Sequence, residues 1–365
     1  MKRLWQQKLT GPKTKLGTLT IGMPTSVHIE AMSPLLQPHV GDIGLDSDRF
    51  SQHYSQLGGA WVRNYQDSAW SFLIDICEGF NNLLADDPII RRLQPRQVIG
   101  VIGSAAHVAG GATSLGDGDT KTYCLAVSAG ATLAPYTLHA RLSAMLDFLP
   151  EIRDGGTRYK VPMDAQTFLV LSDPRLKLAS GLAHVSAYAL LYQQLAHLLR
   201  GHVSLMRTQL TAVSVLATTT IPHDPLGEAI QAEAALYAGR LLAKSMLHAG
   251  SYDTVLGTSI NDRLHRITIA ICVAYLAAAM QGQADEWLKQ VYIMLAGVLS
   301  MISTTPGNRM VLAESLLQPI LQTMQQATFL QTTISSTNLK AWINHAETTM
   351  INMRKVLDPL RGKAT

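Results

Sequence analysis

Two long apolar segments lie in the second half of the chain, and their length restricts what the chain can fold into. The first reads ITIAICVAYLAAAM at residues 267–280, and the second reads VYIMLAGVLSMI at residues 291–302. Both are shorter than the roughly 20 residues that a helix needs to cross a bilayer. We therefore predict two helices buried in the core of a compact protein, with no membrane span.

Helical periodicity extends over the whole region from residue 166 to residue 365. Asp173-Pro174 and Asp224-Pro225 each combine an N-cap residue with proline at the first helical position, which predicts that helices begin there. Further helices are expected over residues 261–280 and 283–302, with at least two more before the end. The Thr-rich segment at residues 217–225 is predicted to be a loop.

Residues 1–165 show a different pattern, with many turn residues and short β-like segments. We predict strands at residues 17–23, 96–103 and 122–130, and helices at residues 68–84 and 132–149. Between the last two strands, the Gly-rich HVAGGATSLGDGDTK is predicted to be a turn or loop. The expected fold class is α+β and mainly helical, with an α+β region at 1–165 and a helical region at 166–365.

Composition narrows the function classes. Hydrophobic residues make up 47% of the chain and charged residues 15%, which argues against a disordered protein. Cys77, Cys124 and Cys272 are widely spaced and form no C-x-x-C pair, which argues against a disulfide framework and a structural zinc site. No apolar segment follows the basic N-terminal residues, so we expect no secretory signal and a cytoplasmic protein.

Basic residues gather at both ends of the chain, although the net charge is only +4. They are Lys2, Arg3, Lys8, Lys13 and Lys15 at the start, and Arg354, Lys355, Arg361 and Lys363 near the end, where Asp358 is the one acid among them. Such ends are commonly solvated, and they can also contact phosphate. A nucleic-acid partner bound through the basic termini is therefore one of the open alternatives.

The segment LLYQQLAHLLRGH at residues 190–202 has the spacing of a zinc-peptidase helix. In the motif H-E-x-x-H, two histidines four residues apart lie on one helix face and bind one metal ion, while the intervening Glu serves as general base. The corresponding residues here are Gln193, Gln194 and His197. The spacing is kept, but two of the three residue types are not.

The chain resembles the Lit-like phage-exclusion family of bacterial gluzincin metallopeptidases. The resemblance rests on Gln193 to His197 followed by Gly201-His202, and on EAIQAEAALYA about thirty residues later, where the family has E-x-E-A-D-x-x-A. TYCLAVSAGATLAPYTLHARL corresponds to a strand and helix that precede the motif, and STTPGNR at residues 303–309 to a later H-P-x-x-x-R segment. The resemblance covers about residues 95–310 and implies a gluzincin-like fold with a small N-terminal β-sheet.

Departures from the family pattern fall on the catalytic positions. The resemblance places Gln231 at the third metal ligand and Ala235 at the Asp that orients a ligand histidine. Only His197 remains of three ligands, and the amide of Gln194 cannot act as a general base. We therefore expect no catalytic residues, no bound metal and no cofactor.

Neighbouring residues offer little replacement for the missing ligands. His202 is about 140° around an ideal helix from His197, and His184 is also on a different face, so neither is expected to bind the same metal ion as His197. Glu228 and Glu233 flank Gln231 but need a register shift, Glu228 being the nearer in face. His223 and His248 could approach only from loops.

These observations leave several interpretations open. The helix at residues 190–202 is either a degenerate catalytic helix or an ordinary amphipathic helix whose polar residues face away from the core. Our preferred hypothesis is an inactive pseudopeptidase that binds a protein partner. The resemblance suggests a bacterial antiphage or toxin-related assembly as its context. We expect Gln193, Gln194 and Gln231 to form hydrogen bonds with one another and with His197. The alternatives are an active zinc metallopeptidase with unorthodox ligands and a nucleic-acid-associated accessory protein.

Overall fold

The computed structural model describes the two helices that carry the family resemblance, together with the elements packed around them. The described residues are 4–9, 19–24, 98–103, 110–115, 122–128, 130–143, 174–203, 205, 215–216, 225–248, 252–279, 287–303, 305–327, 330 and 334–361. The predicted helix at residues 68–84 and most of the predicted loop at 217–225 lie outside these residues. So do the last residues of the helix predicted at 132–149.

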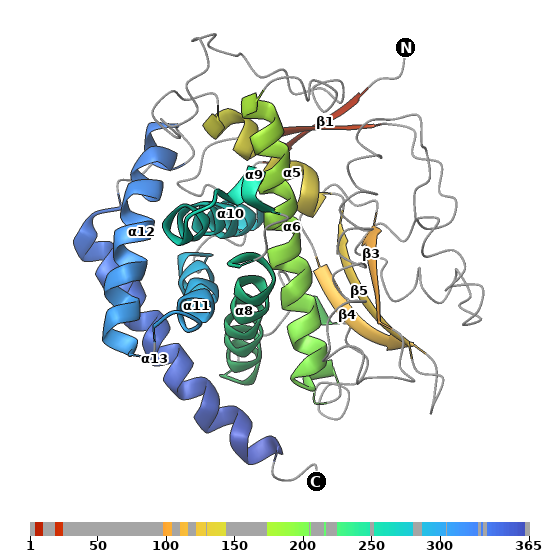
Figure 1. Ribbon diagram of the computed structural model, residues 1–365. Helices are drawn as coiled ribbons and strands as arrows, with labels where there is room; N and C mark the ends of the chain where they lie inside the picture. Colours follow the sequence, from red (N-terminus) through yellow and green to blue (C-terminus); the bar gives the residue numbers. More distant parts are fainter. Residues whose placement is uncertain are drawn as a thin grey trace.

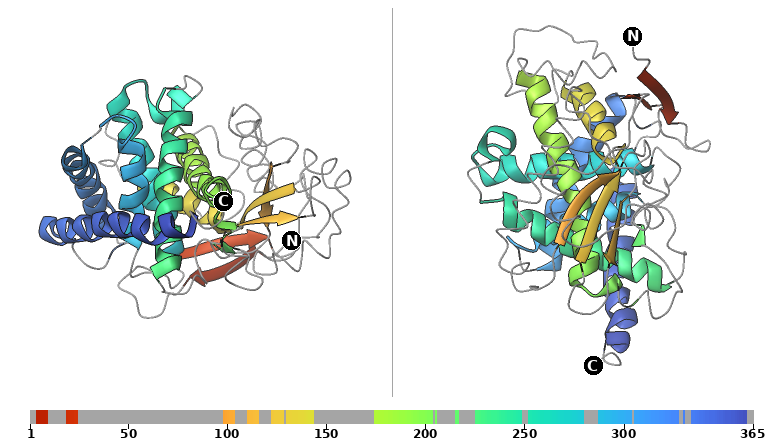
Figure 2. Two further views of the ribbon diagram at one scale, coloured as in Figure 1. Left: turned by 90° about the horizontal axis from the view of Figure 1, so that it is seen from below. Right: turned by 90° about the vertical axis from the view of Figure 1, so that its right-hand side faces the viewer.

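A small mixed sheet lies on one side of the molecule (Figures 1 and 2). Its strand order is β3-β5-β4-β6, and its strands are β3 Val98–Gly103, β4 Gly110–Leu115, β5 Thr122–Ser128 and β6 Val215–Leu216. β3 is parallel to β5, whereas β4 is antiparallel to both β5 and β6. A separate antiparallel hairpin joins β1 Leu4–Leu9 to β2 Leu19–Pro24.

Strand β4 corrects one of the sequence predictions. It occupies the Gly-rich segment predicted as a turn or loop, and it pairs on both edges. Gly110 and Gly111 pair with Val127 and Ala126 of β5. The two neighbouring strands supply the ladder hydrogen bonds that the local sequence does not favour, so tertiary pairing overrides a weak strand propensity. The strands predicted at 96–103 and 122–130 are confirmed as β3 and β5.

Helices make up most of the described residues, which confirms the mainly helical class. They are α5 Gly130–Ser143, α6 Pro174–Leu199, α8 Pro225–Met246, α9 Asp253–Leu256, α10 Ile260–Ala279, α11 Trp287–Leu299, α12 Pro306–Gln326 and α13 Ser336–Arg361. The starts of α6 and α8 agree with the two Asp-Pro signals, and α10 and α11 are buried helices as predicted. Within the described residues, no helix has the length and apolar character needed to cross a membrane.

Helix α6 lies at the centre of the molecule (Figure 1). It packs against β4 and β5 of the sheet and against α5, α8 and α10 on its other sides. Because these elements surround α6 at the position of the motif, Gln193, Gln194 and His197 are buried together with Leu191 and Leu195. The interpretation of this segment as an ordinary amphipathic helix with outward-facing polar residues is therefore wrong.

Helices α8 and α11 approach each other closely through two glycines. A Cβ added to Gly239 of α8 would collide with the carbonyl oxygen of Met294, and one added to Gly297 of α11 would collide with that of Leu236. Helix backbones reach such contact only where no side chain stands between them. This crossing fixes α8 in place, and α8 carries Gln231 and Glu233 towards α6.

Candidate functional site

The structure brings Gln193 and Gln231 into direct contact. The Nε2 of Gln193, on α6, donates a hydrogen bond of 3.0 Å to the Oε1 of Gln231, on α8. The hydroxyl of Tyr275, on α10, donates to the Oε1 of Gln193 over 2.8 Å. Three helices are thus joined by a chain of two side-chain hydrogen bonds.

His197 lies one turn after Gln193 and contacts His202. The two Nδ1 atoms are 3.1 Å apart, and the rings meet edge to face. This contact corrects the expected separation of about 140° between the two residues, because that expectation assumed an uninterrupted helix. Helix α6 ends at Leu199, and Gly201 adopts a φ of 76°, a left-handed conformation that suits glycine and turns His202 back towards His197.

Glu233 extends this contact from α6 to α8. Its Oε2 lies 2.8 Å from the Nε2 of His202, and its Oε1 accepts a hydrogen bond of 2.7 Å from Arg200. Both histidine rings are fully buried, and Glu233 is 8% exposed. The row Glu233, His202, His197 is therefore a buried hydrogen-bonded chain with its carboxylate end held by a guanidinium group.

The hydrogen-bond partners and burial bear on the protonation of the two rings. The carboxylate of Glu233 accepts from the Nε2–H of His202. One of the two facing Nδ1 atoms of His197 and His202 donates to the other, and the tautomers of the rings decide which. Burial lowers the pKa of His197 well below its ordinary value, and the neighbouring His202 lowers it further, whereas Gln231 and Glu233 act in the opposite direction. His197 is accordingly neutral in the folded protein.

Two buried groups at the centre of this site have no hydrogen-bond partner among the described residues. One is the Nε2 of His197, and the other is the whole amide of Gln194, through both its nitrogen and its oxygen. Each such group costs about 1–3 kcal/mol relative to a satisfied one. Gln194 stands where the resemblance places the general base, and its carboxamide cannot take up a proton near neutral pH.

These residues do not fit a zinc ion. The amides of Gln193 and Gln231 bond to each other, and His202 is a link between Glu233 and His197, so the four side chains do not converge on one point. Zinc favours imidazole, thiolate and carboxylate ligands over an amide oxygen. In the part of the chain that the structure describes, no group of three His, Cys, Asp or Glu side chains could hold a metal ion.

The other predicted candidates lie elsewhere. Glu228 accepts a hydrogen bond of 2.7 Å from the buried Lys289 of α11, and His184 bonds to the carbonyl of Ser180 in its own helix. His248 is exposed after α8, Ala235 is fully buried, and His223 lies outside the described residues. Of the two glutamates near Gln231, the structure joins Glu233 to the site and not Glu228, the reverse of the expected preference.

Sequence reasoning missed Tyr275 and Arg200. Tyr275 belongs to the apolar segment at residues 267–280, where it is one of few side chains with a hydrogen-bonding atom, and that contrast is the available signal. Arg200 directly precedes the Gly201-His202 pair, but nothing in the sequence indicates that it reaches Glu233. Of the segment 303–309, residues 306–309 form the start of α12, with Pro306 as its first residue.

The fold and site define a mainly helical protein with a small mixed sheet and a buried network of amide, imidazole and carboxylate groups. No protein-family model, no curated protein and no solved structure matches the chain. The comparisons therefore do not test the resemblance to gluzincin metallopeptidases, which stays a prediction based on the two motif helices.

Proposed function

We propose that this chain is a metallopeptidase-like protein whose reaction centre has been replaced by a structural hydrogen-bond network, and that it acts by binding a protein partner. The hydrogen bond between Gln193 and Gln231 carries this proposal. The resemblance assigns metal ligands to both positions, and in the structure their side chains meet. A cross-link between α6 and α8 is therefore kept, with amides in place of a metal ion.

The orientation of His197 supports the same proposal. A metal-binding histidine usually donates its second ring N–H to a carboxylate, carbonyl or water, which holds the other nitrogen towards the metal. His197 contacts His202, which in turn bonds to Glu233, while the Nε2 of His197 has no hydrogen-bond partner among the described residues. One ligand position thus keeps its supporting contacts although the other two carry amides.

Catalysis through unorthodox ligands is not favoured by this geometry. His202 and Glu233 are the nearest side chains that could serve as metal ligands. Both ring nitrogens of His202 and the Oε2 of Glu233 already take part in the hydrogen-bonded chain. Because one fold can serve many functions, the fold alone does not identify the partner. The resemblance suggests a protein of a bacterial antiphage or toxin-related assembly.

Metal content and chelator sensitivity test the proposal together. Protein purified without chelator should contain zinc well below one ion per chain, and EDTA should leave its melting temperature unchanged, because a structural metal stabilises only while bound. A peptide-cleavage assay with added zinc should show no turnover. One zinc per chain combined with chelator-sensitive peptide cleavage would instead establish an active metallopeptidase.

A further inference from the structure

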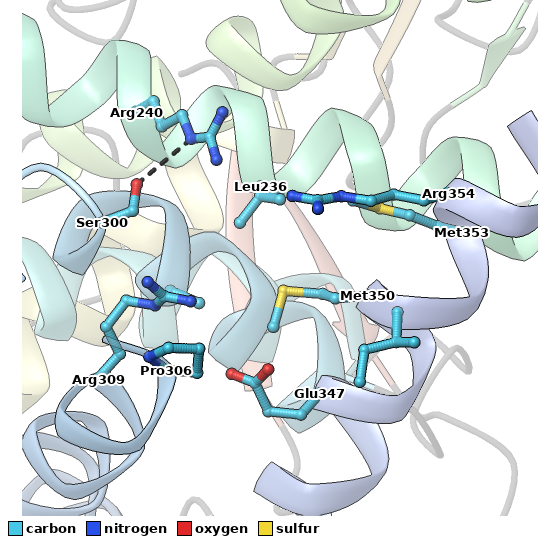
Figure 3. Close-up of a pocket in the computed structure, with 11 residues that line it drawn as sticks. Leu236, Arg240, Ser300, Pro306, Arg309, Glu347, Met350, Met353 and Arg354 are labelled. Atoms are coloured by element: carbon cyan, nitrogen blue, oxygen red, sulfur yellow. Dashed lines mark hydrogen bonds between the residues drawn. The ribbon is translucent and has the colours of Figure 1, made fainter. Parts of the chain in front are cut away.

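A cavity of about 450 Å³ lies outside the amide and histidine network, between helices α8, α11, α12 and α13. Figure 3 shows the side chains that line it. Its volume falls within the range of about 300–1,000 Å³ that is usual for small-molecule sites. The cavity does not include Gln193, His197 or Gln231, so what it binds is independent of the proposed function.

Three arginines from three different helices line this cavity. They are Arg240 of α8, Arg309 of α12 and Arg354 of α13. Arg240 donates through Nε to the hydroxyl of Ser300 over 3.3 Å, which leaves its two terminal nitrogens for another acceptor. Among the described residues, neither Arg240 nor Arg354 forms an ion pair.

The residues that line the cavity include more basic than acidic side chains. Glu347 is the one acidic residue among the lining residues, and its Oε1 already accepts a hydrogen bond of 2.6 Å from Tyr292. Burial lowers the pKa of Arg240, and the charges of Arg354, Arg200 and Arg309 lower it further. The positive charges of these arginines therefore disfavour one another, and a bound anion would offset that repulsion.

Apolar side chains complete the cavity. Leu236, Met350 and Met353 lie beside the arginines (Figure 3). A neighbouring cavity of about 340 Å³ shares Leu236, Arg240, Met353 and Arg354. It is lined in addition by Tyr237, Asp358 and the ion pair of Arg200 with Glu233. The surroundings thus suit a ligand that joins a strongly charged group to an apolar portion.

We propose that this cavity binds a small organic phosphate, with its phosphoryl group among Arg240, Arg309 and Arg354 and its apolar portion against Leu236, Met350 and Met353. Arginine binds phosphate through paired N–H groups in a planar fork. Three guanidinium groups match a dianionic phosphoryl group better than a carboxylate, which carries a single charge.

Calorimetric titration of the full chain at constant ionic strength tests the ligand class. The three probes are phenyl phosphate, inorganic phosphate and benzoate. Phenyl phosphate should bind most tightly, inorganic phosphate more weakly for lack of the apolar portion, and benzoate most weakly. Absence of saturable phenyl phosphate binding up to about 10 mM, or benzoate binding as tight as that of phenyl phosphate, would overturn the proposal.

A pair of matched double variants tests the location. Arg240→Gln combined with Arg354→Gln should weaken phenyl phosphate binding at least about tenfold. Lys244→Gln with Lys355→Gln removes the same charge from the same two helices, but neither lysine lines the cavities, and affinity should stay within about twofold of wild type. Equal weakening by both double variants would show general charge attraction only and overturn the site.

Arg240 bonds to Ser300, so its replacement could disturb the fold. The single variant Arg354→Gln carries the test in that case, because Arg354 is exposed and forms no hydrogen bond or ion pair with the described residues. It should weaken phenyl phosphate binding at least about fivefold with an unchanged melting temperature. Unchanged affinity in this folded variant would overturn the placement of the phosphoryl group.

Discussion

Gln193 has two neighbours that depend on it, Gln231 and the hydroxyl of Tyr275. A buried polar group that loses its partner costs more than the hydrogen bond itself contributed, whereas removal of both partners costs less. The loss of stability in single and double variants therefore shows whether the hydrogen bond between the two amides stabilises the fold.

We predict that Gln193→Leu lowers the free energy of unfolding by about 1–3 kcal/mol, because Tyr275 and Gln231 are left unsatisfied. The double variant with Gln231→Leu should lose less than the sum of the two single losses. Urea unfolding of the four proteins measures the cycle, with Gln322→Leu, an exposed position on α12, as a control that changes little. Simple additivity would contradict the bridge.

Two buried histidines predict how stability changes with pH. Burial lowers the pKa of His139 to about 3 and that of His197 well below its ordinary value. In the unfolded chain both rings take up protons below about pH 6.5, but in the folded protein they remain neutral. Stability should therefore fall on acidification from pH 7.5 to pH 5, by roughly 1 kcal/mol per pH unit below pH 6.5 for each ring.

His139→Gln tests this pH dependence. The Nε2 of His139 lies 2.9 Å from the hydroxyl of Ser186, which donates to the carbonyl of Ala270, so an amide in its place keeps a group that can donate to Ser186. Unfolding free energies of this variant should depend less steeply on pH between 6.5 and 5 than those of the wild type. A slope equal to that of wild type would contradict neutral burial of His139.

At the level of elements, the sequence predicts helix starts better than the contacts that helices make. Proline marks the starts of α6 and α8, because a backbone N–H in the first turn has no partner within the helix and proline lacks that N–H. Strand β4 was missed because its glycines indicate a loop and only its two neighbours make it a strand. His202 was misplaced because an ideal helix was extended past Leu199, and the left-handed turn at Gly201 depends on its backbone conformation.

The sequence predicts only part of the site, because contacts between helices depend on how the helices pack. Of the hypothesis that Gln193, Gln194 and Gln231 bond to one another and to His197, the structure confirms the contact between Gln193 and Gln231. The amide of Gln194 has no hydrogen-bond partner among the described residues, and His197 contacts His202. Glu233, Arg200 and Tyr275 were not expected there, because their contribution depends on how α8 and α10 are rotated against α6. Such rotation follows from packing over the whole core, which local periodicity does not contain.

The crossing of α8 and α11 gives a prediction at the same scale. Gly239→Ala should lower the free energy of unfolding by about 1–3 kcal/mol or more, because the added methyl group meets the backbone of Met294. Gly307→Ala is the matched control, since a Cβ on Gly307 at the start of α12 meets no atom within 4 Å. Equal thermal stability of the two variants would contradict the close approach of the helices.

At the scale of the whole molecule, α6 lies between the sheet and the helices that carry its polar partners (Figure 1). Sheet contacts hold it on one side, and α8 and α10 bring Gln231, Glu233 and Tyr275 to the other. The Arg200–Glu233 pair ends this network and also lines the cavity next to the proposed phosphate site. The central helix thus connects a buried polar network with an arginine-rich surface.

The zinc affinity of a variant with restored ligands tests the proposal that amides occupy the positions of metal ligands. We would replace Gln193→His, Gln194→Glu and Gln231→Glu together and titrate zinc by calorimetry into this variant and the wild type. We expect a dissociation constant below about 1 µM at one ion per chain for the folded variant and no binding by wild type. A folded variant that binds zinc no better than the wild type would contradict the proposal.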